Sequence, residues 1–165
     1  MDNKLFETGR NALGFARMAT EGLLEDIPED QYCHQPLEGT NHALWIMGHI
    51  AVTDEFFLTE LAQPPAAGRP AWKELFFMGS TPKPDITDYP PLSELQAYFK
   101  DVRAGVIEWF GSQSEKELLT PLPEKLGAFS AYRAALMSTL ACHEMLHAGQ
   151  LTVVRKHLGL GPKFG

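Results

Sequence analysis

Four long segments of this sequence carry apolar residues at the three- and four-residue spacing of an amphipathic helix, and this pattern restricts the chain to an all-α fold. We expect the helices at about Asp2 to Ile27, Asn41 to Gln63, Ser93 to Phe110 and Ser130 to Leu158. The expected boundary signals are Pro28 after the first helix, Thr40 or Asn41 and the Pro64-Pro65 pair around the second, a capping box at Ser93-Glu94-Leu95-Gln96, and Gly159 after the fourth.

The connection from Pro64 to Leu92 contains seven of the twelve prolines and is long enough to cross a helical bundle. Such a crossover lets the second and third helices run parallel. The sequence therefore predicts a four-helix bundle with up-down-down-up topology, in a single domain covering residues 1–165. Within the crossover, the segment from Trp72 to Met78 is interpreted as a packing turn in preference to a substrate lid.

The segment His143-Glu144-Met145-Leu146-His147 places two histidines four residues apart in the last predicted helix. Positions i and i+4 of an α-helix lie about 40° apart around the axis, so both imidazoles can bind one metal ion. As letters, the segment is also the HExxH signature of zinc proteases, in which the glutamate is the general base.

The residues after His147 do not supply the third ligand that a zinc protease needs. No carboxylate follows Glu144, and His157 lies about 15 Å further along a continuous helix, far beyond a Zn–N distance near 2 Å. The third ligand must come from upstream, where His49 lies at the centre of an apolar helix. A buried imidazole needs a partner, which is either a backbone carbonyl or a metal.

Taken together, these residues resemble the DinB-like (DinB/YfiT) superfamily. The resemblance rests on Trp45-x-x-Gly48-His49, followed about ninety residues later by His-x-x-x-His-x-Gly-Gln, and it runs over nearly the whole chain. Members of the superfamily are four-helix bundles that bind one divalent metal, often zinc or nickel, through three histidines. The resemblance implies that the ligands here are His49, His143 and His147.

Other polar residues near these histidines have open roles. Gln150 either holds a ligand imidazole or satisfies a backbone carbonyl, and Thr53 has the same alternatives. Glu144 is a candidate to hold a ligand imidazole, to act as a base, or to lie in solvent. His42 is expected at the surface near a helix N-terminus, with the pocket mouth as the alternative, whereas His157 lies too far along to be a ligand.

The composition excludes several classes of partner. A net charge of −7 and a pI near 5.3 disfavour nucleic acid, which requires a basic surface. No apolar run reaches membrane-spanning length and the first residues lack a signal-peptide pattern, so we expect a cytoplasmic protein with no membrane partner. Cys33 and Cys142 are interpreted as buried thiols and not as a disulfide or reactive nucleophiles.

Three imidazoles leave a coordination position open for water or a substrate atom, as in a catalytic metal site. Bound zinc would favour ionisation of water or of a thiol, and relatives implied by the resemblance include transferases that use bacillithiol, mycothiol or glutathione, an isomerase and hydrolases. The prediction is a metal-dependent enzyme that activates a low-molecular-weight thiol or water against a small electrophile, with a homodimer as a possible assembly. The alternatives are a metal-dependent hydrolase and a non-catalytic metal or small-ligand binding protein.

Overall fold

The computed structural model describes residues 3–62 and 69–164, and within these ranges the regular structure is helical, apart from an isolated antiparallel bridge between Pro121 and Tyr132. The α-helices are α1 (Lys4–Leu24), α2 (Ala43–Leu61), α3 (Pro70–Phe76), α4 (Leu92–Gly111), α5 (Glu115–Leu118) and α6 (Arg133–His157). Short 3-10 helices occur at η1 (Glu29–Gln31), η2 (Ile86–Asp88) and η3 (Glu124–Leu126).

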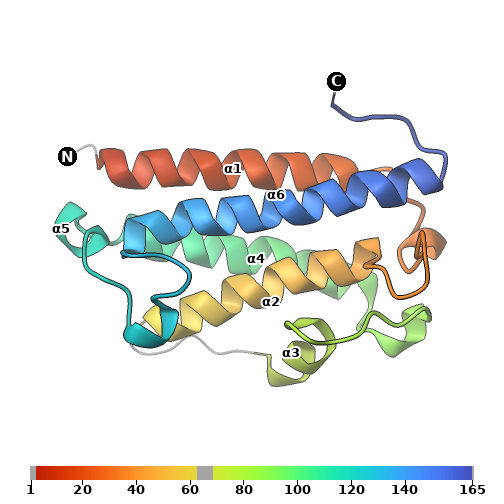
Figure 1. Cartoon of the computed structure of the whole chain (residues 1–165), viewed down its shortest axis with the longest axis horizontal. Helices are drawn as coiled ribbons and strands as arrows, with labels where there is room; N and C mark the ends of the chain where they lie inside the picture. The colour runs from red at the N-terminus through yellow and green to blue at the C-terminus, as the bar shows by residue number, and fades with distance from the viewer. Residues whose placement is uncertain (1–2, 63–68, 165) are drawn as a thin grey trace.

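The four long helices form the predicted bundle (Figure 1). Helices α1 and α6 run side by side in one direction, while α2 and α4 both run in the opposite direction. The segment between α2 and α4, which contains α3 and η2, returns the chain to the end where α2 began. The expected all-α, up-down-down-up arrangement with one long crossover is therefore confirmed.

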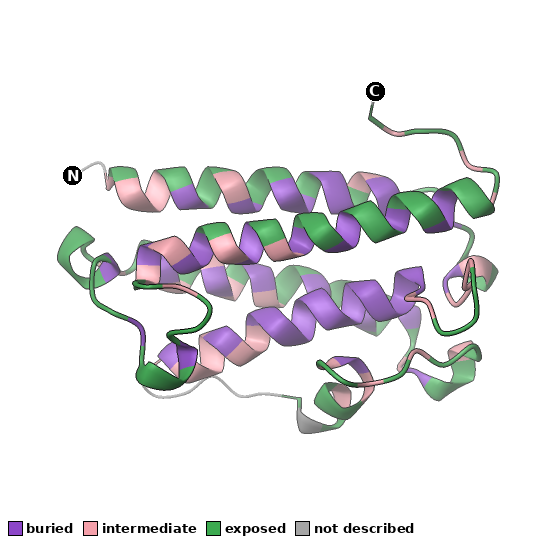
Figure 2. Ribbon diagram, viewed as in Figure 1, coloured by how far each residue is buried: buried purple, intermediate pink, exposed green. Residues whose placement is uncertain are grey.

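Helix α2 is the most deeply buried of the long helices (Figure 2). All residues from Ala43 to Asp54 are buried, because α4, α6 and the crossover cover α2 on different sides. By contrast, α1 and α4 bury one face and expose the other, as amphipathic helices do. A polar side chain between Ala43 and Asp54 is thus placed inside the bundle and requires a partner there.

Several predicted helix ends differ from the observed ones. Helix α1 ends at Leu24, before Ile27, and the N-cap of α4 is Pro91, so the predicted capping box at Ser93 is wrong. Helix α6 begins at Arg133 and not at Ser130, because Arg133 N–H and Ala131 C=O bond to the residues around Pro121 in extended conformation. The expected limits Asp2 and Gln63 and the Pro64-Pro65 pair lie outside the described residues.

One charged side chain from each long helix meets the others in the bundle interior. Arg17 of α1 and Arg103 of α4 pair with Asp54 of α2 and Glu144 of α6, and all four residues are at least nine-tenths buried. The two positive and two negative charges cancel, which reduces the cost of burying them. We call these residues the four-helix charge cluster.

None of the described helices is both long and apolar enough to cross a membrane.

Candidate metal centre

Three imidazoles converge between α2 and α6. His49 lies in the second turn of α2, and His143 and His147 lie one turn apart on α6. The Nε2 atom of His143 is 3.1 Å from Nε2 of His49 and 3.2 Å from Nε2 of His147. One nitrogen from each residue therefore faces a common point, and these ligand atoms all lie within 4.8 Å of one another.

The spacing of these nitrogens suits a divalent metal ion. Two imidazoles bound at about 2.0–2.1 Å in tetrahedral geometry hold their nitrogens about 3.3 Å apart. The observed separations of 3.1 and 3.2 Å differ from this value by a few tenths of an ångström. Two of the three pairs thus have the spacing of metal ligands, and the third pair lies within 4.8 Å.

The outer nitrogens of two imidazoles are fixed by hydrogen bonds. His49 Nδ1 lies 2.7 Å from the backbone carbonyl of Phe76, and His147 Nδ1 lies 2.9 Å from the side-chain oxygen of Gln150. Carbonyl oxygens only accept hydrogen bonds, so both Nδ1 atoms carry the proton. The Nε2 lone pairs of His49 and His147 consequently point toward the shared centre, as metal ligation requires.

Gln150 is itself held in place, since its side-chain oxygen also accepts a 3.1 Å hydrogen bond from Asn41 Nδ2. Of the two roles considered for Gln150, the structure gives contact with an imidazole.

Trp45 supports the first histidine from the preceding turn of α2. Its indole ring stacks on the His49 imidazole, with centroids 4.6 Å apart and planes inclined by 8°, and its N–H donates to Ser80 Oγ at 2.9 Å. Gly48 lies against the Phe76 ring so closely that a Cβ at this position would overlap it. Each residue of the Trp-x-x-Gly-His motif therefore has a physical role in placing His49 against the crossover.

Burial keeps the three imidazoles in the neutral form that binds metal. Loss of hydration lowers the pKa of His49 and of His143 to about 4. The same cause lowers the pKa of His147, where the hydrogen bond to Gln150 acts in the opposite direction. Neighbouring imidazoles add to the effect at His143, because two positive charges at this distance repel. At neutral pH the lone pairs are available to a metal ion.

Glu144 follows His143 in the chain but belongs to the four-helix charge cluster. The residue is fully buried, so the expectation that it could lie in solvent is wrong. One carboxylate oxygen accepts a 2.9 Å hydrogen bond from Arg17, and the other forms a 2.8 Å ion pair with Arg103. Both oxygens are thus engaged by guanidinium groups, which gives Glu144 a role in joining α6 to α1 and α4.

His42 is buried and caps α2, in contrast to the expected surface position and to the expected caps Thr40 and Asn41. Its Nδ1 accepts from the Trp45 backbone N–H at 3.1 Å, and its Nε2 donates to the Lys83 carbonyl at 2.9 Å. Burial lowers the pKa of His42 to about 4. It is a neutral structural residue that ties the start of α2 to the crossover.

The remaining histidines and the two cysteines lie away from this centre. His157 pairs with His34 at the surface, with 2.7 Å between Nδ1 and Nε2. Cys142 is exposed, so the prediction of a buried thiol there is wrong, because α6 turns that position outward from the bundle. Cys33 is half-buried, and burial raises the pKa of its thiol to about 11.

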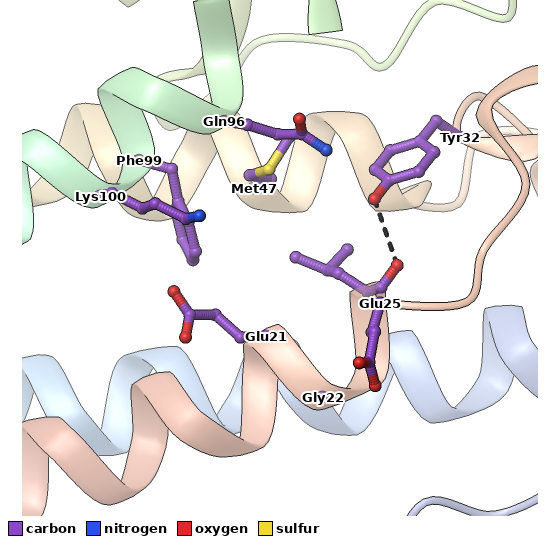
Figure 3. Close-up of a pocket in the computed structure, with 9 residues that line it drawn as sticks. Glu21, Gly22, Glu25, Tyr32, Met47, Gln96, Phe99 and Lys100 are labelled. Atoms are coloured by element: carbon purple, nitrogen blue, oxygen red, sulfur yellow. Dashed lines mark hydrogen bonds between the residues drawn. The ribbon is translucent and has the colours of Figure 1, made fainter. Parts of the chain in front are cut away.

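The surface has a cavity away from the three clustered histidines and another that borders His143. A cavity of 410 Å³ opens between α1, α2 and α4, where Glu21, Met47 and Lys100 are among the lining residues (Figure 3). None of the three clustered histidines lines it. A smaller cavity of 80 Å³ lies beside the histidines, is lined by His143 and Thr53, and is otherwise walled mainly by aromatic and aliphatic side chains.

A helical bundle with a largely buried three-histidine cluster between two of its helices is a candidate metal-binding protein. The family model of the DinB superfamily matches residues 12–151, and the chain belongs to that superfamily. The resemblance identified from the sequence is confirmed by this match. No curated protein matches the chain.

Sequence patterns did not reveal the contacts that orient the histidines. Asn41, Phe76 and Ser80 act through a side-chain amide, a backbone carbonyl and a hydroxyl, and none of them has a recognisable spacing from His49 or His147. Trp45 and Gln150 did have a signal, Trp45 in the Trp-x-x-Gly-His motif and Gln150 at the end of the His-x-x-x-His-x-Gly-Gln pattern.

Proposed function

We propose that this protein is a metal-dependent enzyme that activates a low-molecular-weight thiol, or water, for attack on a small electrophile. The resident ion is zinc or nickel, both of which imidazole ligands suit. His49, His143 and His147 hold the ion. The observation that carries the proposal is the convergence of the three imidazoles, with His143 Nε2 at metal-ligand spacing from the other two Nε2 atoms and with Nδ1 of His49 and of His147 fixed by hydrogen bonds.

The number of ligands favours catalysis over a purely structural metal. Structural zinc sites are closed by four protein ligands, whereas catalytic sites have three and leave a position for substrate. In the described part of the chain, the ligand group consists of His49, His143 and His147, with no fourth histidine, cysteine or carboxylate in it. A bound ion would supply Lewis acidity that favours the ionised form of a thiol or of water.

The chain itself provides orientation and a partly dry environment. Phe76 and Gln150 hold the ring planes of two ligands, and Trp45 covers one face of His49. His49 and His147 are buried, while the half-buried His143 borders the 80 Å³ cavity. Substrate approach from the side of His143 is consistent with this pattern of burial.

Glu144 is not assigned as a base in this proposal, because two arginines hold its carboxylate within the bundle. Protons released from a thiol or water would pass to solvent or buffer on the open side of the cluster.

The test compares metal-loaded wild-type protein with His143→Ala and with His157→Ala as the matched control on the same helix. Each protein is incubated with bacillithiol, mycothiol or glutathione and a panel of small electrophiles, beside a panel of hydrolysable esters and amides. We expect thiol conjugation above the buffer rate with wild type and His157→Ala, and the buffer rate with His143→Ala. Metal content is measured in every sample.

The other outcomes distinguish the alternatives. Turnover in the hydrolysis panel alone would assign a hydrolase to the same site. Rates equal to buffer in every well, from protein of confirmed metal content, would favour the non-catalytic metal or small-ligand binding protein.

A further inference from the structure

The cavity beside His143 has an unusually apolar wall. Phe56 and Phe57 come from α2, Phe77 and Met78 follow α3, and Phe129 precedes α6. The phenylalanine rings form a continuous series of contacts, from Phe77 to Phe56 (5.3 Å between centroids), Phe57 (5.2 Å) and Phe129 (5.0 Å). Three segments far apart in sequence thus build one aromatic wall next to a metal-ligand candidate.

Two residues of this wall are exposed in spite of being apolar. Met78 is 65% exposed and Phe129 is 39% exposed. Contact of apolar side chains with water is unfavourable in free energy, and a group of such side chains around a cavity is typical of a ligand site. The loop that carries Phe129 is held by Thr139, whose hydroxyl donates to the Phe129 carbonyl at 3.2 Å. This hydrogen bond joins the Phe129 side of the wall to α6.

Thr53, which lines this apolar cavity, carries a buried hydroxyl. Thr53 is 8% exposed, and within the described residues its hydroxyl has no hydrogen-bond partner. A buried hydroxyl without a partner is unfavourable, so such a group is a candidate to bond a polar atom of a ligand. Thr53 lies one turn after His49 on α2 and lines the cavity together with His143.

The cavity volume limits what can enter. A cavity of about 150 Å³ accommodates benzene, and the cavity here measures 80 Å³. A branched alkyl group of about four carbon atoms fits this space better than an aromatic ring does. Because Met78 is flexible and forms part of the wall, shortening it should enlarge the cavity.

The same short segment builds the cavity and orients the metal ligand. Phe76 accepts the hydrogen bond of His49, Phe77 and Met78 wall the cavity, and Ser80 accepts the indole N–H of Trp45. The end of α3 and the residues after it therefore contact both the histidine side of α2 and the cavity. The segment from Trp72 to Met78, predicted as a packing turn, contains the end of α3 and packs Phe76 into the core.

We propose that the cavity lined by Thr53, Phe57, Met78, Phe129 and His143 binds a compact branched alkyl group of the substrate electrophile, while the Thr53 hydroxyl bonds to a polar atom beside that group. This inference rests on the proposed function and adds the substrate class. Thr53 is a substrate-binding residue whose hydroxyl has its partner when the ligand is bound.

The test measures binding of simple alcohols to zinc-loaded protein, because alcohols carry no electrophilic centre and their binding is independent of turnover. Isobutanol, benzyl alcohol and glycerol are titrated while methionine methyl groups are observed by NMR. Met78 reports on the cavity, and Met18, which is exposed on α1, is the control reporter. We expect isobutanol to shift the Met78 methyl saturably without shifting Met18, and to bind more tightly than either other alcohol.

Three variants separate the parts of the proposal. Thr53→Val removes the hydroxyl with little change of shape and should weaken isobutanol binding about three- to tenfold, with an unchanged or higher Tm because an unpartnered group is lost. Met78→Ala, titrated with the Leu140 methyl groups as the cavity reporter, should improve benzyl alcohol binding relative to isobutanol. Phe15→Ala, which removes an exposed ring of α1, should alter neither affinity.

Equal isobutanol affinity in wild type and Thr53→Val would overturn the role of the hydroxyl, and glycerol binding as tight as isobutanol would overturn the apolar cavity as the site. Chemical-shift changes of the Met18 methyl equal to those of the Met78 methyl would also overturn the cavity as the binding site. Isobutanol binding in the cavity without any turnover would refute the proposed function and leave the ligand site standing. Turnover without isobutanol binding would refute the alkyl-binding cavity and leave the proposed function standing.

Discussion

Glu144 Oε1 lies 2.9 Å from Nε of Arg17, although the next residue along the chain toward the N-terminus is the ligand candidate His143. One residue corresponds to about 100° around a helix, so the two neighbours face different parts of the bundle. His143 faces α2 and the other histidines, while Glu144 faces the arginines of α1 and α4. The HExxH letters therefore have a different structural meaning here from that in a zinc protease.

Removal of the Glu144 carboxylate should destabilise the fold strongly. In Glu144→Ala, Asp54 would be the one carboxylate left in the cluster for both Arg17 and Arg103, and breaking a buried pair in this way costs about 3–5 kcal/mol. Urea unfolding at pH 7 measures the loss. Glu108→Ala, at an exposed position of α4, is the control and should change the free energy of unfolding by less than about 0.5 kcal/mol. Similar values for both variants would contradict the assigned role.

The three clustered histidines should each be needed for metal binding. We expect close to one divalent ion per wild-type chain and little or none in His49→Ala, His143→Ala or His147→Ala, because two imidazoles hold an ion far less tightly than three. Elemental analysis of purified, folded protein gives the content. His157→Ala should match wild type, since its partner is His34 at the surface. Wild-type metal content in all three ligand variants would refute the site.

Gln150 should matter for affinity without being a ligand. Its side-chain oxygen fixes the orientation of His147, and loss of such an outer contact usually weakens metal binding about 10- to 100-fold. A zinc titration of Gln150→Ala against a competing chelator measures this change. Thr152→Ala, on the same helix, removes only a hydrogen bond to the Gly149 carbonyl and should leave the affinity as it is. Equal affinities in the two variants would show that His147 needs no support.

The long helices, their directions and the three histidines could be predicted because each depends on local periodicity or on a motif with characteristic spacing. The contacts of Phe76 and Glu144 could not. Phe76 acts through its backbone carbonyl, which every residue has, and Glu144 acts through arginines more than forty residues away in sequence. His42 was misplaced for a related reason, since its cap position depends on the Lys83 carbonyl of the crossover.

Metal binding should resist mild acid and fail in stronger acid. Protons compete with metal for Nε2, and burial lowers the pKa of His49 and His143 to about 4. We expect zinc to be retained on dialysis at pH 6 and to be lost as the pH falls below about 4, near those pKa values. Zinc content after dialysis across this range is the measurement. Release centred at the ordinary histidine pKa of about 6.5 would mean that the imidazoles are not desolvated in this way.

His42 allows the effect of one buried imidazole on stability to be isolated. Its pKa is about 4 in the folded protein, against about 6.5 in an unfolded chain. Between these values the unfolded state takes up a proton that the folded state rejects, so the stability present above pH 6.5 decreases as the pH falls toward 4.

His42→Asn should keep an oxygen that can cap α2 but remove the titrating group. Metal-free wild type and variant are unfolded in urea at pH 7.5 and pH 4.5. For each protein, the decrease in the free energy of unfolding between the two pH values is calculated, and the two decreases are compared. The contributions of the other histidines are present in both proteins and cancel in this comparison. We expect the wild-type loss to exceed that of the variant by up to about 2–3 kcal/mol, which follows from about 1.4 kcal/mol per pKa unit. Equal losses would mean that His42 titrates alike in the folded and unfolded states, which its full burial opposes.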